Sequence, residues 1–195
     1  MKQSIRRRLA PLLAVVITTA SGMTLAAAGT AQANTASPLD HEITNQQSTT
    51  YQIQNRRNSE CLTAPSWREA QQIITRGCED PRFQPAQRQW SFIPVRWENN
   101  QLYYMIVSAY NDMCLDVLHA EEANWAIVAQ WTGPCIGGDN QLWRVERRPS
   151  SWQQLTVKHT GKCLDISWGA AIQFTCEHRS ENQDFWIRSS TAMSR

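Results

Sequence analysis

The chain has 195 residues, 18% of them charged, and a formal net charge of +2 at pH 7. Four of its 19 basic side chains, and none of its 17 acidic ones, lie in residues 1–33, so the rest of the chain has 15 basic and 17 acidic side chains. This mildly acidic balance excludes an electrostatic case for nucleic acid or an anionic membrane surface as the partner. Residues 34–195 suit one domain with a single core.

The first 33 residues have the pattern of an export signal. Lys2 and the arginines at 6–8 precede an apolar stretch, and the Ala-Gln-Ala sequence at 31–33 is a small-x-small cleavage site. A transmembrane anchor is the alternative, but the apolar run at 9–20 is shorter than the roughly 20 residues that a span needs. We therefore predict a signal peptide over 1–33, a secreted mature chain that does not insert stably into membranes and, from its arginine-rich and lysine-poor composition, a bacterial source.

Short strands follow a polar leader. Residues 34–48 have few apolar positions and predict a flexible leader. From Thr49 onward, apolar and polar residues alternate in short stretches separated by turn clusters such as 55–59 and 137–140, which predicts an all-β fold. Residues 118–128 look helical only in part and lack a sustained period, so we expect a loop or a single turn there.

One sequence unit occurs three times. The middle copy begins with Cys-Leu-Asp-Val at Cys114, has Trp131 shortly before its second cysteine, and ends with Asn-Gln-Leu-Trp at Trp143. Eroded copies run from Cys61 to Trp90 and from Cys163 to Trp186. An apolar residue stands eight positions before each opening cysteine, at Ile53, Ile106 and Leu155.

Three such repeats, each with about four strands, predict a closed threefold arrangement. We place the domain at 49–190 and its repeats at about 49–97, 98–150 and 151–190. The aromatic rings that end the repeats, Trp90, Trp143 and Trp186 or its neighbour Phe185, are predicted to pack in the core, with adjacent glutamines bonding backbone groups.

The six cysteines fall as one pair in each repeat. An exported chain meets an oxidising compartment, so disulfides are expected, and six cysteines allow 15 connectivities. The repeat symmetry favours one of them: Cys61–Cys78, Cys114–Cys135 and Cys163–Cys176. Each would contribute about 3 kcal/mol. Neither a Cys-x-x-Cys motif nor a histidine cluster supports a zinc site, and we expect no metal or cofactor.

The three units, each with two cysteines and a closing aromatic, resemble the ricin B-type lectin β-trefoil family over roughly residues 49–190. The resemblance implies a β-trefoil that binds sugars and carries no catalysis. The first repeat departs most, because Thr63 replaces the aspartate, Arg76 replaces the aromatic and Arg88 takes the Gln position of Gln-x-Trp. The third repeat closes on Phe185, with Trp186 shifted by one.

The resemblance also implies the binding residues. In the second repeat Asp116 would accept hydrogen bonds from two sugar hydroxyls, Trp131 would stack on the ring, Asn140 would donate and Gln141 would brace the site. The corresponding set in the third repeat is Asp165, Phe174, Asn182 and Gln183. The first repeat should not bind. Glycans or polysaccharides are then the partners, held weakly at each site and more firmly through two sites together.

Simpler interpretations stay open for several of these side chains. Asp116 and Asp165 also suit the capping of a turn after a strand. Trp131 also suits the core, since two extra residues separate it from Pro134-Cys135. Trp125 and Trp168 fit an exposed position beside a ligand and peripheral packing equally well.

An enzyme and a protein-interaction module are the two other classes of function to compare with the sequence. The sequence has no Gly-x-Ser-x-Gly or His-Glu-x-x-His motif, and the acidic pair at 121–122 suits a solvated loop, so an enzyme is not expected. The alternative function is a protein-interaction β-trefoil, acting as a protease inhibitor or as the targeting subunit of a secreted toxin. Its partner would then be a secreted toxin or hydrolase.

Overall fold

The computed structural model describes residues 49–132, 135 and 137–190. The predicted signal peptide and leader, residues 1–33 and 34–48, lie outside the described residues. Among the described residues, no helix is both long enough and apolar enough to cross a membrane. The predicted helix-like segment contains only a short 3₁₀ turn, η3 (Leu118–Ala120), as expected from its weak period.

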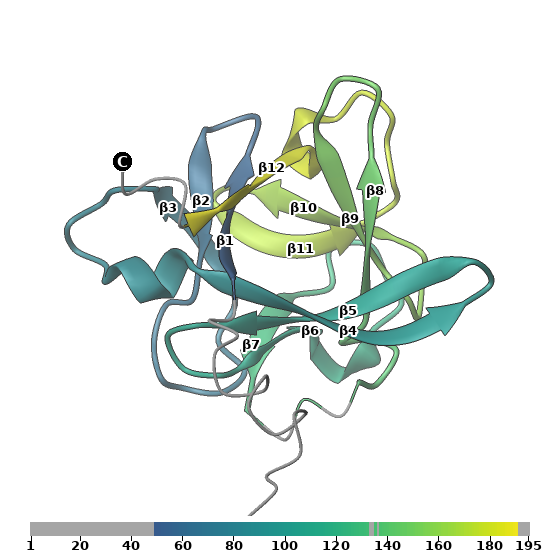
Figure 1. Cartoon of the computed structure of the whole chain (residues 1–195), viewed down its shortest axis with the longest axis horizontal. Coiled ribbons are helices and arrows are strands. Elements are labelled where there is room, and N and C mark those ends of the chain that lie inside the picture. The colour runs from purple at the N-terminus through teal and green to yellow at the C-terminus, as the bar shows by residue number, and fades with distance from the viewer. Residues whose placement is uncertain (1–48, 133–134, 136, 191–195) are drawn as a thin grey trace, which may run out of the picture. The chain divides into compact units, whose positions relative to one another are not determined.

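The described residues form twelve short strands, shown in Figure 1. The first repeat contains β1 (Thr50–Asn55), β2 (Glu60–Thr63), β3 (Ile74–Gly77) and β4 (Trp90–Glu98). The second contains β5 (Gln101–Ser108), β6 (Cys114–Val117), β7 (Val128–Trp131) and β8 (Trp143–Arg147). The third contains β9 (Gln153–Val157), β10 (Cys163–Ser167), β11 (Ala170–Phe174) and β12 (Phe185–Ser189). The 3₁₀ turns η2 (Pro85–Arg88) and η4 (Glu181–Gln183) precede β4 and β12.

Six strands close a barrel. The antiparallel pairs β1–β4, β4–β5, β5–β8, β8–β9, β9–β12 and β12–β1 form an unbroken ring, so none of these strands is left as an open edge. The first and last described strands, β1 and β12, close the ring through five residue pairs, from Tyr51↔Ser189 to Asn55↔Phe185.

The other six strands form three hairpins, β2–β3, β6–β7 and β10–β11. Neighbouring hairpins meet through single bridges: Ala170↔Ile74, Gln72↔Ala129 and Ile127↔Ile172. Each repeat therefore gives two strands to the ring and two to the hairpin layer. This is the β-trefoil that the repeat pattern predicts.

The core follows the threefold pattern. Ile53, Ile106 and Leu155, the apolar residues eight positions before the opening cysteines, are completely buried. Two of the closing rings also anchor a hairpin, because the indole nitrogens of Trp90 and Trp143 donate to the carbonyls of Leu62 (3.0 Å) and Leu115 (2.9 Å).

In the third repeat the core ring is Phe185, and the interpretation that Trp186 fills this place is wrong. Phe185 is completely buried, whereas Trp186 is 45% exposed. Successive side chains of a strand point to opposite faces, so only one of the two can point inward. Trp186 packs on the surface, edge-to-face with Trp152 at 5.7 Å and beneath the Arg188 guanidinium.

All three predicted disulfides form. Cys61 bonds Cys78, Cys114 bonds Cys135 and Cys163 bonds Cys176, so each repeat has one. Each joins the first residues of a hairpin to the segment that leaves it, and thereby fixes the loop that leads to the next 3₁₀ turn or ring strand.

Candidate functional site

The second repeat brings its predicted aspartate and tryptophan to one face of the β6–β7 hairpin. Cys114 pairs with Trp131, and Asp116 pairs with Ala129. Paired residues share a face, and residues two apart on one strand do too, so Asp116 and Trp131 are diagonal neighbours with Cα atoms about 7–8 Å apart. Asp116 is 3% exposed and Trp131 is partly exposed.

Two amides hold the Asp116 carboxylate. Asn140 Nδ2 donates to Oδ2 at 3.0 Å, and Gln141 Nε2 donates to the same oxygen at 2.9 Å. The turn before β8 presents both, and Gly138 is needed in it because a Cβ there would lie 2.9 Å from Oδ1 of Asn140. The sequence thus brings three of the four predicted residues into direct contact.

The Asn140 side chain cannot donate a hydrogen bond to a sugar, which is the role expected from the sequence. Its second Nδ2–H donates to the Val117 carbonyl at 3.1 Å, while the Val117 amide donates to the Asn140 carbonyl at 3.0 Å. Both side-chain N–H groups are therefore used within the protein. Asn140 can offer a ligand the acceptor Oδ1, but no donor.

Burial raises the pKa of Asp116 above its usual range, against the lowering effect of the hydrogen bonds from Gln141 and Asn140. The nearby His119 and His159 also lower this pKa through their charge. These histidines were missed from the sequence, because His159 belongs to the third repeat and no spacing links it to Asp116. An ionised carboxylate fixed in this way is a strong acceptor for a ligand hydroxyl.

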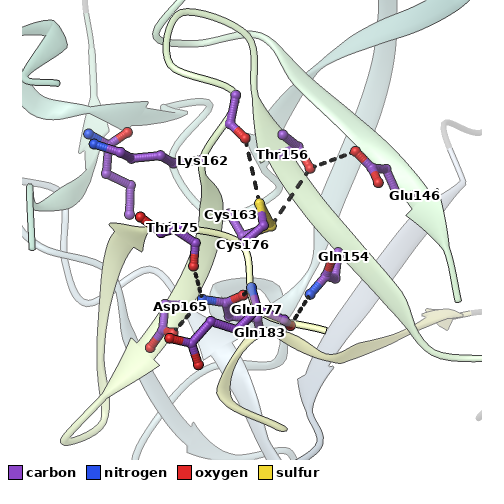
Figure 2. Close-up of a disulfide and its surroundings, with 12 residues drawn as sticks. Glu146, Gln154, Thr156, Lys162, Cys163, Asp165, Thr175, Cys176, Glu177 and Gln183 are labelled. Atoms are coloured by element: carbon purple, nitrogen blue, oxygen red, sulfur yellow. Dashed lines mark hydrogen bonds between the residues drawn. A yellow bond between two sulfur atoms is a disulfide. The ribbon is translucent and has the colours of Figure 1, made fainter. Parts of the chain in front are cut away.

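In the third repeat, Gln183 occupies the centre of the site (Figure 2). Its Nε2 donates to Asp165 Oδ2 and to the Thr175 carbonyl, each at 2.9 Å, and its Oε1 accepts from the Glu177 amide at 2.8 Å. Burial raises the pKa of Asp165, the Gln183 bond opposes this and Glu177 adds to it. Gln183 therefore joins Asp165 to backbone beside the Cys163–Cys176 disulfide, as predicted for the glutamines.

The third repeat lacks two features of the second. The Asn182 side chain does not bond Asp165, and its Oδ1 is buried with no hydrogen-bond partner among the described residues. The predicted platform Phe174 is met by Trp125 of the second repeat, edge-on, with ring centroids 5.2 Å apart.

A buried glutamine, Gln173, positions Trp125 of the second repeat beside Phe174 of the third. Gln173 Nε2 donates to the carbonyls of Glu121 (2.6 Å) and Ala123 (2.9 Å), and the Trp125 amide donates to the Gln173 carbonyl at 2.9 Å. Gln130 holds the loop of the first repeat in the same way, through the carbonyls of Ser66 and Arg68. Each loop thus covers the hairpin of the next repeat, so Phe174 shares its surface with Trp125.

The first repeat lacks the groups of the second. Thr63 is completely buried and donates to the Cys61 carbonyl at 2.8 Å. Gln87 takes the place of Asn140 and donates to the Ala64 carbonyl at 2.9 Å. Arg88 is buried and donates to the Asp80 carbonyl at 2.7 Å. We retain the prediction that this repeat does not bind.

A family model described as "Ricin-type beta-trefoil lectin domain-like" matches residues 86–175. No curated protein matches the chain. Among solved structures, the designed threefold-symmetric protein ThreeFoil is 24% identical, with a TM-score of 0.61 over 72% of this chain and 98% of its own.

Two larger proteins share the fold over part of their length. An exo-beta-1,3-galactanase from Clostridium thermocellum is 22% identical, with a TM-score of 0.63 over 74% of this chain and 31% of its own. A Polyporus squamosus lectin, solved with Neu5Aca2-6Galb1-4GlcNAc, is 15% identical, with a TM-score of 0.60 over 72% of this chain and 49% of its own. The chain therefore spans less than a third of the galactanase and about half of the lectin. The family match over residues 86–175 and the closed three-repeat barrel together show that this chain is similar to the ricin-type β-trefoil lectin-like family.

Proposed function

We propose that this protein is an exported, non-catalytic carbohydrate-binding protein whose main site lies in the second repeat. One observation carries the proposal: the Asp116 carboxylate, fixed by Asn140 and Gln141, shares a hairpin face with the partly exposed indole of Trp131. A sugar ring has C–H groups on one face and hydroxyls at its edge. An aromatic ring beside a carboxylate matches both.

Each part of the site has a separate task. The Trp131 indole covers the apolar face of the sugar, and Asp116 accepts from ring hydroxyls. Gln141 keeps the carboxylate in place, and Asn140 adds the acceptor Oδ1. The third repeat offers a second site around Asp165, Asn182 and Gln183, although its predicted platform, Phe174, is met edge-on by Trp125. Two shallow sites on one rigid domain favour clustered or repeating glycans, because the second contact is made at a high effective concentration.

The disulfides and the predicted signal peptide support export. Three disulfides persist in an oxidising compartment and are rare in the cytosol. The ricin-type lectin family that this chain resembles is generally non-catalytic, which supports a role in binding rather than turnover.

Replacing Trp131 by alanine should weaken glycan binding about tenfold, because the apolar face of the sugar loses its platform. A glycan array identifies the ligand with the unchanged protein, and calorimetry then compares the variants on that ligand. Trp97→Ala is the matched control, since Trp97 is 66% exposed on β4 and outside the site. Equal losses in both variants, or no binding to any glycan, would refute the proposal.

Sugar affinity should fall in mildly acidic solution. Because the pKa of Asp116 is raised, its carboxylate is protonated, and loses acceptor strength, at a higher pH than an ordinary aspartate with a pKa of about 3.9. Calorimetric titrations between neutral pH and pH 4 measure this change. The isosteric Asp116→Asn variant should bind weakly at every pH. A variant with the pH dependence of the unchanged protein would assign the titration to another group.

The raised pKa of Asp116 affects folding stability in the opposite direction from sugar affinity: low pH weakens binding but favours the folded state. A carboxyl whose pKa is higher in the folded chain than in the unfolded chain holds its proton more tightly when folded. Its contribution to stability is therefore full below the unfolded pKa and decreases as the pH rises through the raised folded pKa. At neutral pH the ionised Asp116 reduces stability, which is consistent with selection for binding.

The β4–β5 hairpin favours a second candidate function, protein interaction. Ile93, Val95 and Trp97 on β4 are exposed. Trp97 pairs with Leu102, which lines a hollow of about 570 Å³ together with Phe92 and Tyr104. Exposed apolar groups of this kind suit a protein partner such as a protease, toxin or hydrolase subunit. A glycan array without any bound sugar would favour this function.

A further inference from the structure

We infer that the junction of the third and first repeats forms a saccharide subsite with Trp168 as its stacking platform. The inference rests on the proposed function and deepens it. The subsite is a hollow of about 410 Å³. Its walls are the β1–β2 turn (Asn55, Arg57, Asn58), the β10–β11 turn (Ile166, Ser167, Trp168, Gly169) and Asn182 before β12.

Trp168 stands fully in solvent at the tip of a tight hairpin. β10 ends at Ser167 and β11 begins at Ala170, so Trp168 and Gly169 alone make the turn. Their φ angles are +52° and +76°, a pair typical of a type I′ turn, in which asparagine or glycine is preferred at the first position. A bulky residue in this conformation is strained, yet its side chain is 101% exposed and gains no packing in return. Strain of this kind supports a role in binding.

Two of the asparagines that line the hollow, Asn55 and Asn182, have an unsatisfied acceptor. Oδ1 of Asn182 and Oδ1 of Asn55 are buried and have no hydrogen-bond partner among the described residues. Asn55 is 1% exposed, and its Nδ2 donates to the Asn182 carbonyl at 2.9 Å, which fixes the two residues relative to each other. Buried acceptors without donors are costly, so the hollow favours a ligand that brings hydroxyl donors.

The junctions between the first and second repeats and between the second and third repeats lack this pair of asparagines with unsatisfied oxygens. Asn140, the counterpart of Asn182, uses its amide on Asp116 and Val117. The counterparts of Asn55, at the ends of β5 and β9, are Ser108 and Val157. Ser108 Oγ already accepts from the Tyr110 amide, and Val157 is apolar. Only the third-to-first junction combines two free amide oxygens with an exposed indole among the described residues.

The chemistry of the hollow fits a sugar ring. A ring hydroxyl can donate to Asn182 when this partly exposed side chain rotates its oxygen toward the hollow, while the C–H face lies on the Trp168 indole. The exposed Arg57 guanidinium stands at the rim as a donor for further ring oxygens. Asn58 adds no free group, since its amide bonds Glu60 and Thr75 and its oxygen accepts from the Glu60 amide. The platform of the third repeat is therefore Trp168, and Phe174 lies on the face that Trp125 shares.

The test uses the purified protein and its best array glycan, in an Asp116→Ala background that leaves binding to the third repeat. Adding Trp168→Asn, which suits the turn and removes the indole, should weaken the residual binding at least about tenfold with an unchanged or higher melting temperature. Adding Asn182→Leu, which removes one acceptor, should also weaken it. Phe174→Leu in the same background should change it less than threefold.

The outcomes separate the two proposals. If the unchanged protein binds no glycan, the proposed function fails. If the protein binds but Asp116→Ala abolishes all binding, the second-repeat site stands and the junction subsite is refuted. The subsite is also refuted if Trp168→Asn has no effect or if Phe174→Leu has the larger one.

Discussion

Alanine in place of Asp116 is expected to weaken binding at the second-repeat site by about 10- to 100-fold. The change removes a hydrogen bond to a charged acceptor, which is worth about 1.5–3 kcal/mol. It also leaves the amides of Asn140 and Gln141 without the oxygen that holds them at 3.0 and 2.9 Å. Isothermal titration calorimetry with the best array glycan measures the loss.

Asp139→Ala is the matched control for this change. Asp139 has the same charge and stands next to Asn140, but it is exposed and paired with Arg96 and Lys158. Its removal should change affinity by less than threefold. Because Asp116→Ala also unpairs two buried donors, we expect it to lower stability by about 1–3 kcal/mol, and binding is measured well below the melting temperature. A control that weakens binding as much as Asp116→Ala would contradict the assignment.

Trp143→Ala should have the largest effect on stability, a loss of about 3–5 kcal/mol. The ring is completely buried and its nitrogen donates to the Leu115 carbonyl, so the variant loses packing and leaves a buried carbonyl unpaired. Domains of this size are stable by about 5–15 kcal/mol, so the variant should lose a substantial part of its stability. Urea denaturation followed by fluorescence measures the change.

Trp186→Ala is the companion variant, because it removes the same side chain from a surface position in the third repeat. Trp186 is 45% exposed, and we expect its loss to cost less than about 1.5 kcal/mol. Equal losses for Trp143→Ala and Trp186→Ala would overturn the assignment of the closing rings to core and surface.

Much of the fold was predictable because the repeat unit is local in sequence. The Cys-Leu-Asp opening, an aromatic shortly before the second cysteine and the Asn-Gln-x-aromatic closure recur in the third repeat, and a closed threefold barrel follows from three such units. The disulfide pairing and the buried rings of Trp90 and Trp143 were predicted on the same basis. The spacing of Asn-Gln-x-aromatic also identified Phe185 as an alternative to Trp186, and strand alternation decides between them.

The sites were predictable only in part, because their details depend on contacts between repeats. The approach of Trp125 to Phe174 depends on Gln173, which holds a loop that begins some 50 residues earlier in the chain. The free oxygens of Asn55 and Asn182 result from the way β1 meets the turn before β12. No spacing within one repeat contains such information. The one available signal at the junction was Gly169 between two alternating stretches, because glycine is typical of the second position of a two-residue hairpin turn.

The pairing of β1 with β12 has a consequence for how the molecule is made. The first strand of the ring has its partner at the very end of the described chain, so the ring is incomplete while residues 185–189 are still inside the ribosome or a translocation channel. Contacts this distant in sequence are slow to form. For the exported chain proposed above, a ring that cannot close early leaves the nascent chain unfolded during translocation, and folding then takes place in the compartment where cysteines are oxidised.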